Sequence, residues 1–382
     1  MSTRYIDYHV ENLRLSKFVN TSFTNSTQYR GRVQNKFGQY WGDLSFQIAG
    51  LHDVRPRTGT FANPWGAVSD AMYVLPTLEP VLDSLATLLD RRANELLSLS
   101  RPIAVMWSGG IDSTCVLAAL IKNASEHNQI IVYHTNESIA ENPEFYNKFI
   151  ANRLQTGNAD ELEVTEEFLK THILLHGDPG DCLYGPSMSM YKHLLPDAKH
   201  LLAWRSNRNL IIDGIVHRGA IHEFATWYVD KVSANISEAV GYDIVTIADW
   251  WWWHYFNLKW EFSIMRPFFI SRAKTSRQCI SASTVHDYVQ NTFYNTDYFQ
   301  NWSYTNLARL CYDPEQHKQQ AKQYIFELDH NANYLNNKQK VVSILGNTAT
   351  TPLYLGPDYR AYHYGDPGLA QAMILLLEQY AG

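Results

Sequence analysis

The chain has 382 residues, of which 45% are hydrophobic, 18% charged and 13% aromatic, and its formal net charge is −6. These proportions exclude a disordered, collagen-like or low-complexity chain, because such chains lack the apolar side chains that form a core. No apolar run approaches the roughly 18 residues that span a membrane, so we expect no membrane association. The first residues contain no apolar segment of a secretory signal, and the net negative charge argues against broad nucleic-acid binding.

The cysteine pattern predicts reduced thiols. The four cysteines are scattered along the chain, at Cys115, Cys182, Cys279 and Cys311. None belongs to a C-x-x-C pair, which argues against a thiolate zinc site. Scattered thiols in a chain of this size are typical of a reducing compartment, so a cytoplasmic protein is expected.

The first hundred residues predict a small mixed α/β region of unknown role, residues 1–100, before a main domain over residues 101–382. Residues 1–60 mix polar, aromatic and short apolar stretches, which favour short strands and turns. From Leu78 to Leu99, apolar residues including Val81, Leu82 and Leu85 recur at helical spacing. This periodicity predicts an amphipathic helix.

The next segment alternates apolar strands with helices. Strands are predicted at Arg101–Trp107, Ile130–Tyr133 and Ile173–Leu175, with helices at Thr114–Lys122 and Pro143–Leu154. This alternation predicts an α/β fold with a parallel, doubly wound sheet. Beyond Tyr184 the pattern becomes mainly helical, with aromatic-rich helices around 220–232 and 247–265.

The sequence SGGIDS, Ser108–Ser113, lies between the first predicted strand and its helix. Gly109 and Gly110 allow the backbone to approach a ligand closely, and the helix directs its free N–H groups to the same place. Ser108 and Ser113 add hydroxyl donors, so the loop suits a phosphate or pyrophosphate. Asp112 would repel a bare anion and therefore implies a bridging Mg²⁺. A capped strand-to-helix turn without a ligand is the alternative.

SGGIDS after an apolar strand resembles the pyrophosphate loop of the N-type ATP pyrophosphatases. The resemblance implies an adenine nucleotide alpha hydrolase-like fold, with ATP and Mg²⁺ as cofactors. Enzymes of this group cleave ATP to AMP and pyrophosphate while they adenylate a carboxylate, an amide or a related oxygen.

A second motif, LLHGDPGDCLYG at residues 174–185, carries two acids three residues apart on a glycine-flanked turn. It resembles the G-[DE]-G-x-D-E-x-x-G-G segment of asparagine synthetases and their relatives, the β-lactam synthetases and lasso-peptide cyclases. The resemblance places Gly177 on the first glycine, Asp178 on the acid that helps to position or deprotonate the nucleophile, and Asp181 on a metal-binding acid. The chain departs from the pattern at three positions, Pro179, Cys182 and Pro186. A tight acidic surface turn is the alternative.

Two downstream segments give weaker matches. NKQKVVS, residues 337–343, resembles the loop that supplies the catalytic lysine of asparagine synthetases, with Lys340 in that place. Such a cation would stabilise charge that develops on the phosphorus and on pyrophosphate. Lys322 is a further candidate. WEFSIMRPFF, residues 260–269, makes Glu261 and Arg266 nearby candidates, although a core helix ended by proline is the favoured interpretation.

The glutaminase half of asparagine synthetases is expected to be absent. Residue 2 is Ser rather than the nucleophilic Cys, and no cysteine precedes Cys115. We therefore expect free ammonia, another amine or a separate glutaminase partner to supply nitrogen, as in the phage asparagine synthetase-like proteins that this chain resembles. A homodimer is left open.

The predicted function is an ATP-dependent, AMP-forming ligase that makes an amide from a small carboxylate, aspartate-like by default. Ser108, Gly109, Gly110, Asp112, Ser113 and Gly177 would bind the nucleotide, Asp112 and Asp181 the metal ion, and Asp178 and Lys340 would be catalytic. One alternative is a nucleobase- or tRNA-modifying enzyme of the same ATP pyrophosphatase group. The other is a non-catalytic ATP-binding protein of the same fold.

Overall fold

The computed structural model of the chain describes residues 57–58, 75–127, 129–186, 191, 193–217, 222–239, 241–260, 263–264, 267, 281–306, 317–338, 354–355 and 361–362. The short strands expected in residues 1–60 therefore lie outside the described residues, apart from a turn at Arg57 and Thr58. None of the described helices has the length and apolar character needed to cross a membrane.

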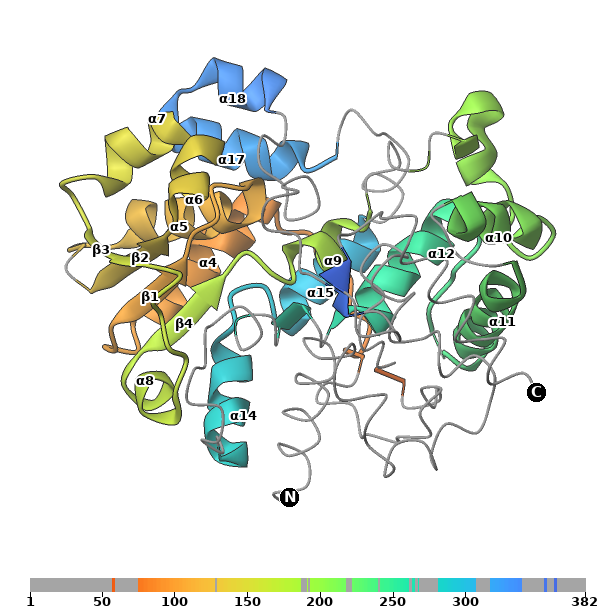
Figure 1. Ribbon diagram of the computed structural model, residues 1–382, viewed down its shortest axis with the longest axis horizontal. Coiled ribbons are helices and arrows are strands. Elements are labelled where there is room, and N and C mark those ends of the chain that lie inside the picture. Colours follow the sequence, from red (N-terminus) through yellow and green to blue (C-terminus); the bar gives the residue numbers. More distant parts are fainter. Residues whose placement is uncertain are drawn as a thin grey trace.

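The central feature is a four-stranded, all-parallel sheet in the order β3-β2-β1-β4 (Figure 1). Its strands are β1 (Ile103–Met106), β2 (Ile130–His134), β3 (Gln155–Asn158) and β4 (Ile173–His176). The chain runs outward from β1 to β3 and then returns to the other side of β1 as β4. The carboxyl ends of β1 and β4 therefore flank a topological switch point, where α/β sheets place their ligands.

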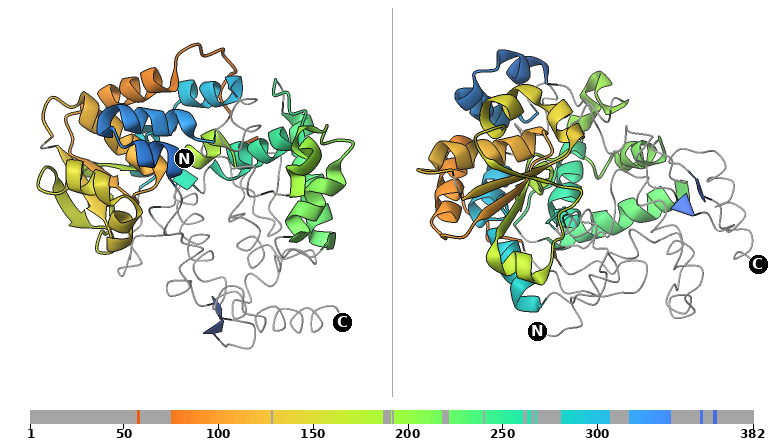
Figure 2. Two further views of the ribbon diagram at one scale, coloured as in Figure 1. Left: turned by 90° about the horizontal axis from the view of Figure 1, so that it is seen from above. Right: turned by 60° about the vertical axis from the view of Figure 1, so that its left-hand side comes forward.

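Helices connect the parallel strands of the sheet. Between the strands lie α5 (Ile111–Asn123), α6 (Asn136–Glu141), α7 (Pro143–Phe145), the π-helical turn η1 (Tyr146–Ile150) and α8 (Glu166–Thr171). The α/β class and the parallel sheet predicted from the alternation are thus confirmed. In Figure 2, α4 (Leu85–Leu97), α5 and α17 (Gln319–Asp329) group together, while α8 lies beside α14 (Ala282–Asn291).

Two predictions about this region are corrected. The helix expected from Leu78 begins only at Leu85, because Pro80 interrupts the preceding turn and the Ser84 side chain caps the first turn. Leu82, which the helical periodicity assigned to the apolar face, is 98% exposed. The sequence pattern also missed β3, whose residues QTGN are polar and mostly exposed, so this edge strand has no apolar signal.

The rest of the described chain is mainly helical, as predicted. It contains α9 (Gly180–Tyr184), the 3₁₀ segment η3 (Pro196–Leu201), α10 (Arg208–His217), α11 (His222–Glu238), α12 (Ile247–Trp253), the π-helical turn η4 (His254–Leu258), α15 (Asp297–Thr305) and α18 (Ala332–Asn337). A small antiparallel pair, β5 (Tyr354–Leu355) and β6 (Ala361–Tyr362), lies near the carboxyl terminus. The run Trp250–Trp253 is fully buried and forms part of the hydrophobic core.

Candidate functional site

The SGGIDS loop connects β1 to α5 and lies against α6. Gly109 has a φ of +73°, and a β-carbon there would approach the Ser138 carbonyl oxygen to 2.3 Å and the Glu141 Cβ to 2.7 Å. Only glycine combines this backbone conformation with so close a contact. Gly110 is the N-cap of α5 and has an ordinary φ of −71°. The first glycine is thus required by the packing of the loop, whereas the second is not.

The two serines of the loop hydrogen-bond to each other. The Ser113 hydroxyl accepts from the Ser108 backbone N–H at 3.1 Å and lies 2.9 Å from the Ser108 hydroxyl. The first intrahelical bond of α5 runs from the Thr114 N–H to the Gly110 carbonyl, so the amides of the first helical turn have no intrahelical acceptor. Hydroxyl and amide donors therefore surround the carboxyl end of β1.

The acidic turn after β4 lies directly on this helix start. A β-carbon at Gly177 would come within 2.6 Å of the Ser113 backbone nitrogen, and one at Gly180 within 2.9 Å of the Asp112 Cγ. The Asp178–Pro179 peptide bond between them is cis. The two motifs, separated by more than 60 residues in the sequence, therefore form one surface at the switch point.

Asp112 and Asp181 meet through a lysine that belongs to neither motif. The Lys318 ammonium hydrogen-bonds and ion-pairs with Asp112 Oδ2 and with Asp181 Oδ1. Burial raises the pKa of Asp112 to about 7, against the opposing effect of Lys318. Although burial alone would lower the pKa of Lys318, the two carboxylates raise it above its usual value. Lys318 therefore stays charged at neutral pH.

Asp178 is held at its backbone N–H by a chain of hydrogen bonds. The Asp178 backbone N–H donates to His176 Nδ1 at 3.2 Å, and His176 Nε2 lies 2.9 Å from the Tyr288 hydroxyl. Because Tyr288 donates its proton to the Ile264 carbonyl, His176 must donate from Nε2 and accept at Nδ1. His176 itself is buried.

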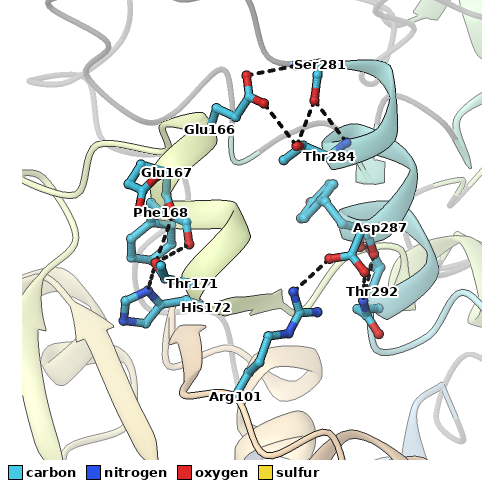
Figure 3. A network of polar contacts seen from close by, with 12 residues as sticks. Arg101, Glu166, Glu167, Phe168, Thr171, His172, Ser281, Thr284, Asp287 and Thr292 are labelled. Atoms are coloured by element: carbon cyan, nitrogen blue, oxygen red, sulfur yellow. Dashed lines mark hydrogen bonds and ion pairs between the residues drawn. The ribbon is translucent and has the colours of Figure 1, made fainter.

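Tyr288 lies on α14, and polar contacts attach that helix to its surroundings (Figure 3). The Glu166 carboxylate, at the start of α8, accepts from the Ser281 N–H at 3.1 Å and from the Thr284 hydroxyl at 3.3 Å. Arg101, just before β1, donates to Asp287 at 2.9 Å. The strand that carries His176 and the helix that carries Tyr288 are thus fixed relative to each other.

Further lysines lie close to Lys318. Lys338 ion-pairs with Glu141 in a largely buried contact and also donates to the Glu141 carbonyl at 3.2 Å. Glu141 in turn packs against Gly109, so Lys338 is adjacent to the loop. Burial lowers the pKa of Lys322, as do Lys318 and Lys338. The charges of Lys318 and Lys338 therefore both act on Lys322.

The structure brings most of the predicted site residues together at the switch point. These are Ser108, Gly109, Gly110, Asp112, Ser113, Gly177, Asp178 and Asp181. Lys322 lies one turn beyond Lys318 on α17, whereas Lys340, Glu261 and Arg266 lie outside the described residues. Lys318, Lys338 and Tyr288 were missed, because a single lysine or tyrosine carries no motif. Lys338 does belong to the NKQKVVS segment, so that motif could have indicated this lysine as well as Lys340.

Two chemistries find little support in the described part of the chain. Cys115 and Cys182 are free and buried, and burial raises the pKa of each thiol to about 12. Neither thiol supplies a thiolate at neutral pH. No cluster of three or more His, Cys, Asp or Glu side chains that could hold a metal ion occurs among the described residues.

No protein-family model, curated protein or solved structure matches this chain at a significant level.

Proposed function

We propose that the chain is an ATP-dependent, AMP-forming ligase of the asparagine synthetase-like kind, with an adenine nucleotide alpha hydrolase-like fold. The observation that carries this proposal is the direct contact between the SGGIDS loop and the acidic turn at the switch point of the sheet. Donor groups for an anion and carboxylates for a cation lie side by side there, and a metal–polyphosphate needs both.

The anion half of the site is the loop with its neighbours. The Ser108 and Ser113 hydroxyls and the first amides of the 13-residue helix α5 are donors at its positive end. Lys338 adds a positive charge beside Gly109. In the proposed reaction, these groups orient the β- and γ-phosphates and stabilise the pyrophosphate that leaves.

The two carboxylates, Asp112 and Asp181, offer oxygen ligands of the kind that suits magnesium. Asp112 Oδ1 is buried and has no hydrogen-bond partner, so one carboxylate oxygen remains for a ligand. Asp181 is 42% exposed and could turn toward a metal ion. Carboxylate oxygens are the protein ligands that Mg²⁺ prefers. When bound, the ion would offset phosphate charge and orient the triphosphate.

The remaining groups serve the two displacements. A substrate carboxylate oxygen attacks the α-phosphorus, forming the acyl–AMP bond and breaking the bond to pyrophosphate. An amine nitrogen then attacks the acyl carbon, so that AMP leaves with the bonding electrons and the nitrogen loses a proton. Asp178 is the acceptor for that proton. Its backbone is held in place by His176, which in turn contacts Tyr288. Lys340 remains the proposed catalytic lysine in the segment that follows Lys338.

A non-catalytic nucleotide-binding protein is the second candidate. It is favoured by the position of Lys318, which occupies the space between the two carboxylates that a metal ion would need. Such a protein would bind Mg–ATP without turning it over.

The deciding experiment incubates the purified chain with Mg–ATP and measures AMP and pyrophosphate. The panel comprises no substrate, aspartate with ammonia, and a pool of small carboxylates with ammonia or with other small amines. AMP and pyrophosphate that rise with a carboxylate support the ligase, and the active carboxylate identifies the acyl substrate. ADP and phosphate as products would contradict it. ATP binding without any product would favour the non-catalytic protein or a macromolecular substrate such as tRNA.

Two variants locate the chemistry. Asp112→Asn should lower AMP formation by about 10²–10³-fold, the usual cost of removing one electrostatic group, while ATP binding persists. The control is Asp160→Asn, which removes an exposed carboxylate after β3 and should leave AMP formation unchanged. Equal activity in both variants would exclude Asp112 from the site.

A further inference from the structure

We propose that Lys318 is a resident cation that keeps free divalent metal ions off Asp112 and Asp181, so that metal binds only together with a polyphosphate that accepts the Lys318 ammonium. Binding of the anionic ligand would thus control whether a metal ion can bind. The inference relies on the proposed function only in naming a polyphosphate as that ligand.

The first support is the placement of Lys318. It lies at the N-terminal boundary of α17, with a left-handed backbone φ of 58°, and its side chain is only 9% exposed. Its ammonium contacts one carboxylate from the start of α5 and one from α9. Lys318 therefore connects three helices at the point where the two motifs meet.

The second support is the charge balance. One ammonium faces two carboxylates, and Asp178 acts on Asp112 as a further negative charge. The cluster therefore attracts additional positive charge. A divalent ion that entered while Lys318 remained would lie next to a buried ammonium, and like charges repel strongly where water is scarce. Metal alone must therefore either displace Lys318 from both carboxylates or stay out of the site.

The third support is the set of groups that could receive an anion. Lys322 lies one helical turn beyond Lys318, and Lys338 lies beside the loop. The pKa of Lys322 is lowered by burial and then by these two lysines, so added negative charge here would relieve mutual repulsion. A polyphosphate bound at the loop would offer oxygen acceptors to Lys318 and would free both carboxylates for the metal ion.

The prediction is cooperativity between metal and phosphate, which can be measured without turnover. Mn²⁺ is titrated into the full chain and followed by electron paramagnetic resonance, alone and with saturating pyrophosphate. In the wild-type chain, pyrophosphate should tighten Mn²⁺ binding to the protein by at least tenfold, after correction for Mn²⁺–pyrophosphate in solution. Equal Mn²⁺ affinity with and without pyrophosphate would overturn the proposal, and this arm needs no variant.

The variant arm tests the lysine itself. Lys318→Met should bind Mn²⁺ alone at least tenfold more tightly than wild type, and pyrophosphate should add less than threefold. Adding Asp112→Asn to this variant should cancel the gain, which locates the metal ion. The control is Lys122→Met, which removes a lysine paired with Asp90 at the far end of α5 and should leave Mn²⁺ binding within twofold of wild type.

The outcomes separate this inference from the proposed function. Cooperative Mn²⁺ binding without AMP formation would support the proposed role of Lys318 and count against the proposed ligase activity. AMP formation with Mn²⁺ bound equally by wild type and Lys318→Met would support the ligase and overturn the proposed role of Lys318. Circular dichroism of Lys318→Met checks that the variant is folded. If it is not, Lys318→Gln replaces it, with the same expected gain in affinity for Mn²⁺ alone.

Discussion

Arg57 and Lys318 are buried cations in two different regions of the described chain, and they are held in different ways. In the aromatic helical region, Arg57 lies over the Phe256 and Trp260 rings, 5.0 and 4.6 Å from their centroids, and donates to the Phe256 carbonyl. At the switch point of the sheet, Lys318 is held by two carboxylates. Ring faces and a neutral carbonyl attract the arginine without any negative charge, whereas the lysine is paired with two carboxylates, the protein ligands that Mg²⁺ prefers.

Because of this difference, substitutions in the two regions are expected to have different effects. The aromatic region buries four consecutive tryptophans, and the indole N–H groups of Trp252 and Trp253 donate to Ser303 and Asn235 at 3.0 Å. Its side chains pack against and hydrogen-bond to one another, so substitutions there should lower the free energy of unfolding.

If the proposed function holds, substitution of the charged groups Asp112, Asp181 and Lys318 should affect ligand binding more than folding. By contrast, substitution of the packed residues Gly109 and Tyr288 should also lower stability. The following predictions test that difference.

The largest effect is expected for Trp252→Ala. Trp252 is fully buried and stacks on Phe256 at 4.4 Å between ring centroids. Its removal should lower the free energy of unfolding by about 3–5 kcal/mol, through lost apolar burial and a cavity. Urea titration measures the change, with Leu82→Ala at a 98% exposed side chain as the control, expected within about 0.5 kcal/mol of wild type. A similar small change in both variants would contradict the assignment of this core.

A matched glycine pair tests the loop. Gly109→Ala should cost more than about 2 kcal/mol, because the substitution combines a left-handed φ with contacts of 2.3 and 2.7 Å to α6. Gly110→Ala should cost less than about 1 kcal/mol, because its β-carbon would meet only the Ser108 hydroxyl, at 3.3 Å. Chemical denaturation of the two variants gives the comparison. If Gly110→Ala proved the more damaging, the loop conformation would be wrong.

A smaller effect is expected for Tyr288→Phe. The change removes the hydroxyl between His176 and the Ile264 carbonyl, which leaves buried polar groups unpaired at a cost of about 1–3 kcal/mol. If the proposed function holds, kcat for AMP formation should also fall while the KM for ATP stays within twofold, since only Asp178 loses its support. Tyr298→Phe, which removes a hydrogen bond to the partly exposed Glu95, is the control and should change neither kinetic constant.

The smallest effect concerns pH. The side-chain contact with Lys170 and then the hydrogen bond from Ser281 lower the pKa of Glu166 to about 2. A carboxyl with a lowered folded-state pKa stabilises the protein above its unfolded pKa, near 4.5, and that contribution is lost as the pH falls toward 2. Glu166→Gln should therefore lower the urea midpoint at pH 7, and the difference from wild type should disappear near pH 2. Glu167→Gln is the control. In Figure 3 the Thr171 hydroxyl contacts the backbone oxygen of Glu167, and the substitution leaves that oxygen in place.

The sequence by itself determined the parts that local patterns encode. The apolar runs at 101–107, 130–133 and 173–175 predict strands that the structure has at 103–106, 130–134 and 173–176. The predicted site glycines at 109 and 177 do lie at close backbone approaches. Parallel strands end at the same edge of a sheet, so two motifs that each follow a strand had to meet there. Ser108–Ser113 and Asp178–Asp181 could therefore be assigned to one site before the structure was known.

Only the tertiary structure decided which groups complete the site. Lys318 reaches Asp112 across 206 residues, and Tyr288 reaches His176 across 112. Contacts of this kind depend on how whole helices pack on one another, and a lone lysine or tyrosine carries no periodic or local signal of its partner. The same holds for β3, which owes its place to the backbone ladder with β2 rather than to its own polar residues. Local spacing thus specifies elements and turns, whereas long-range packing specifies which charges face each other.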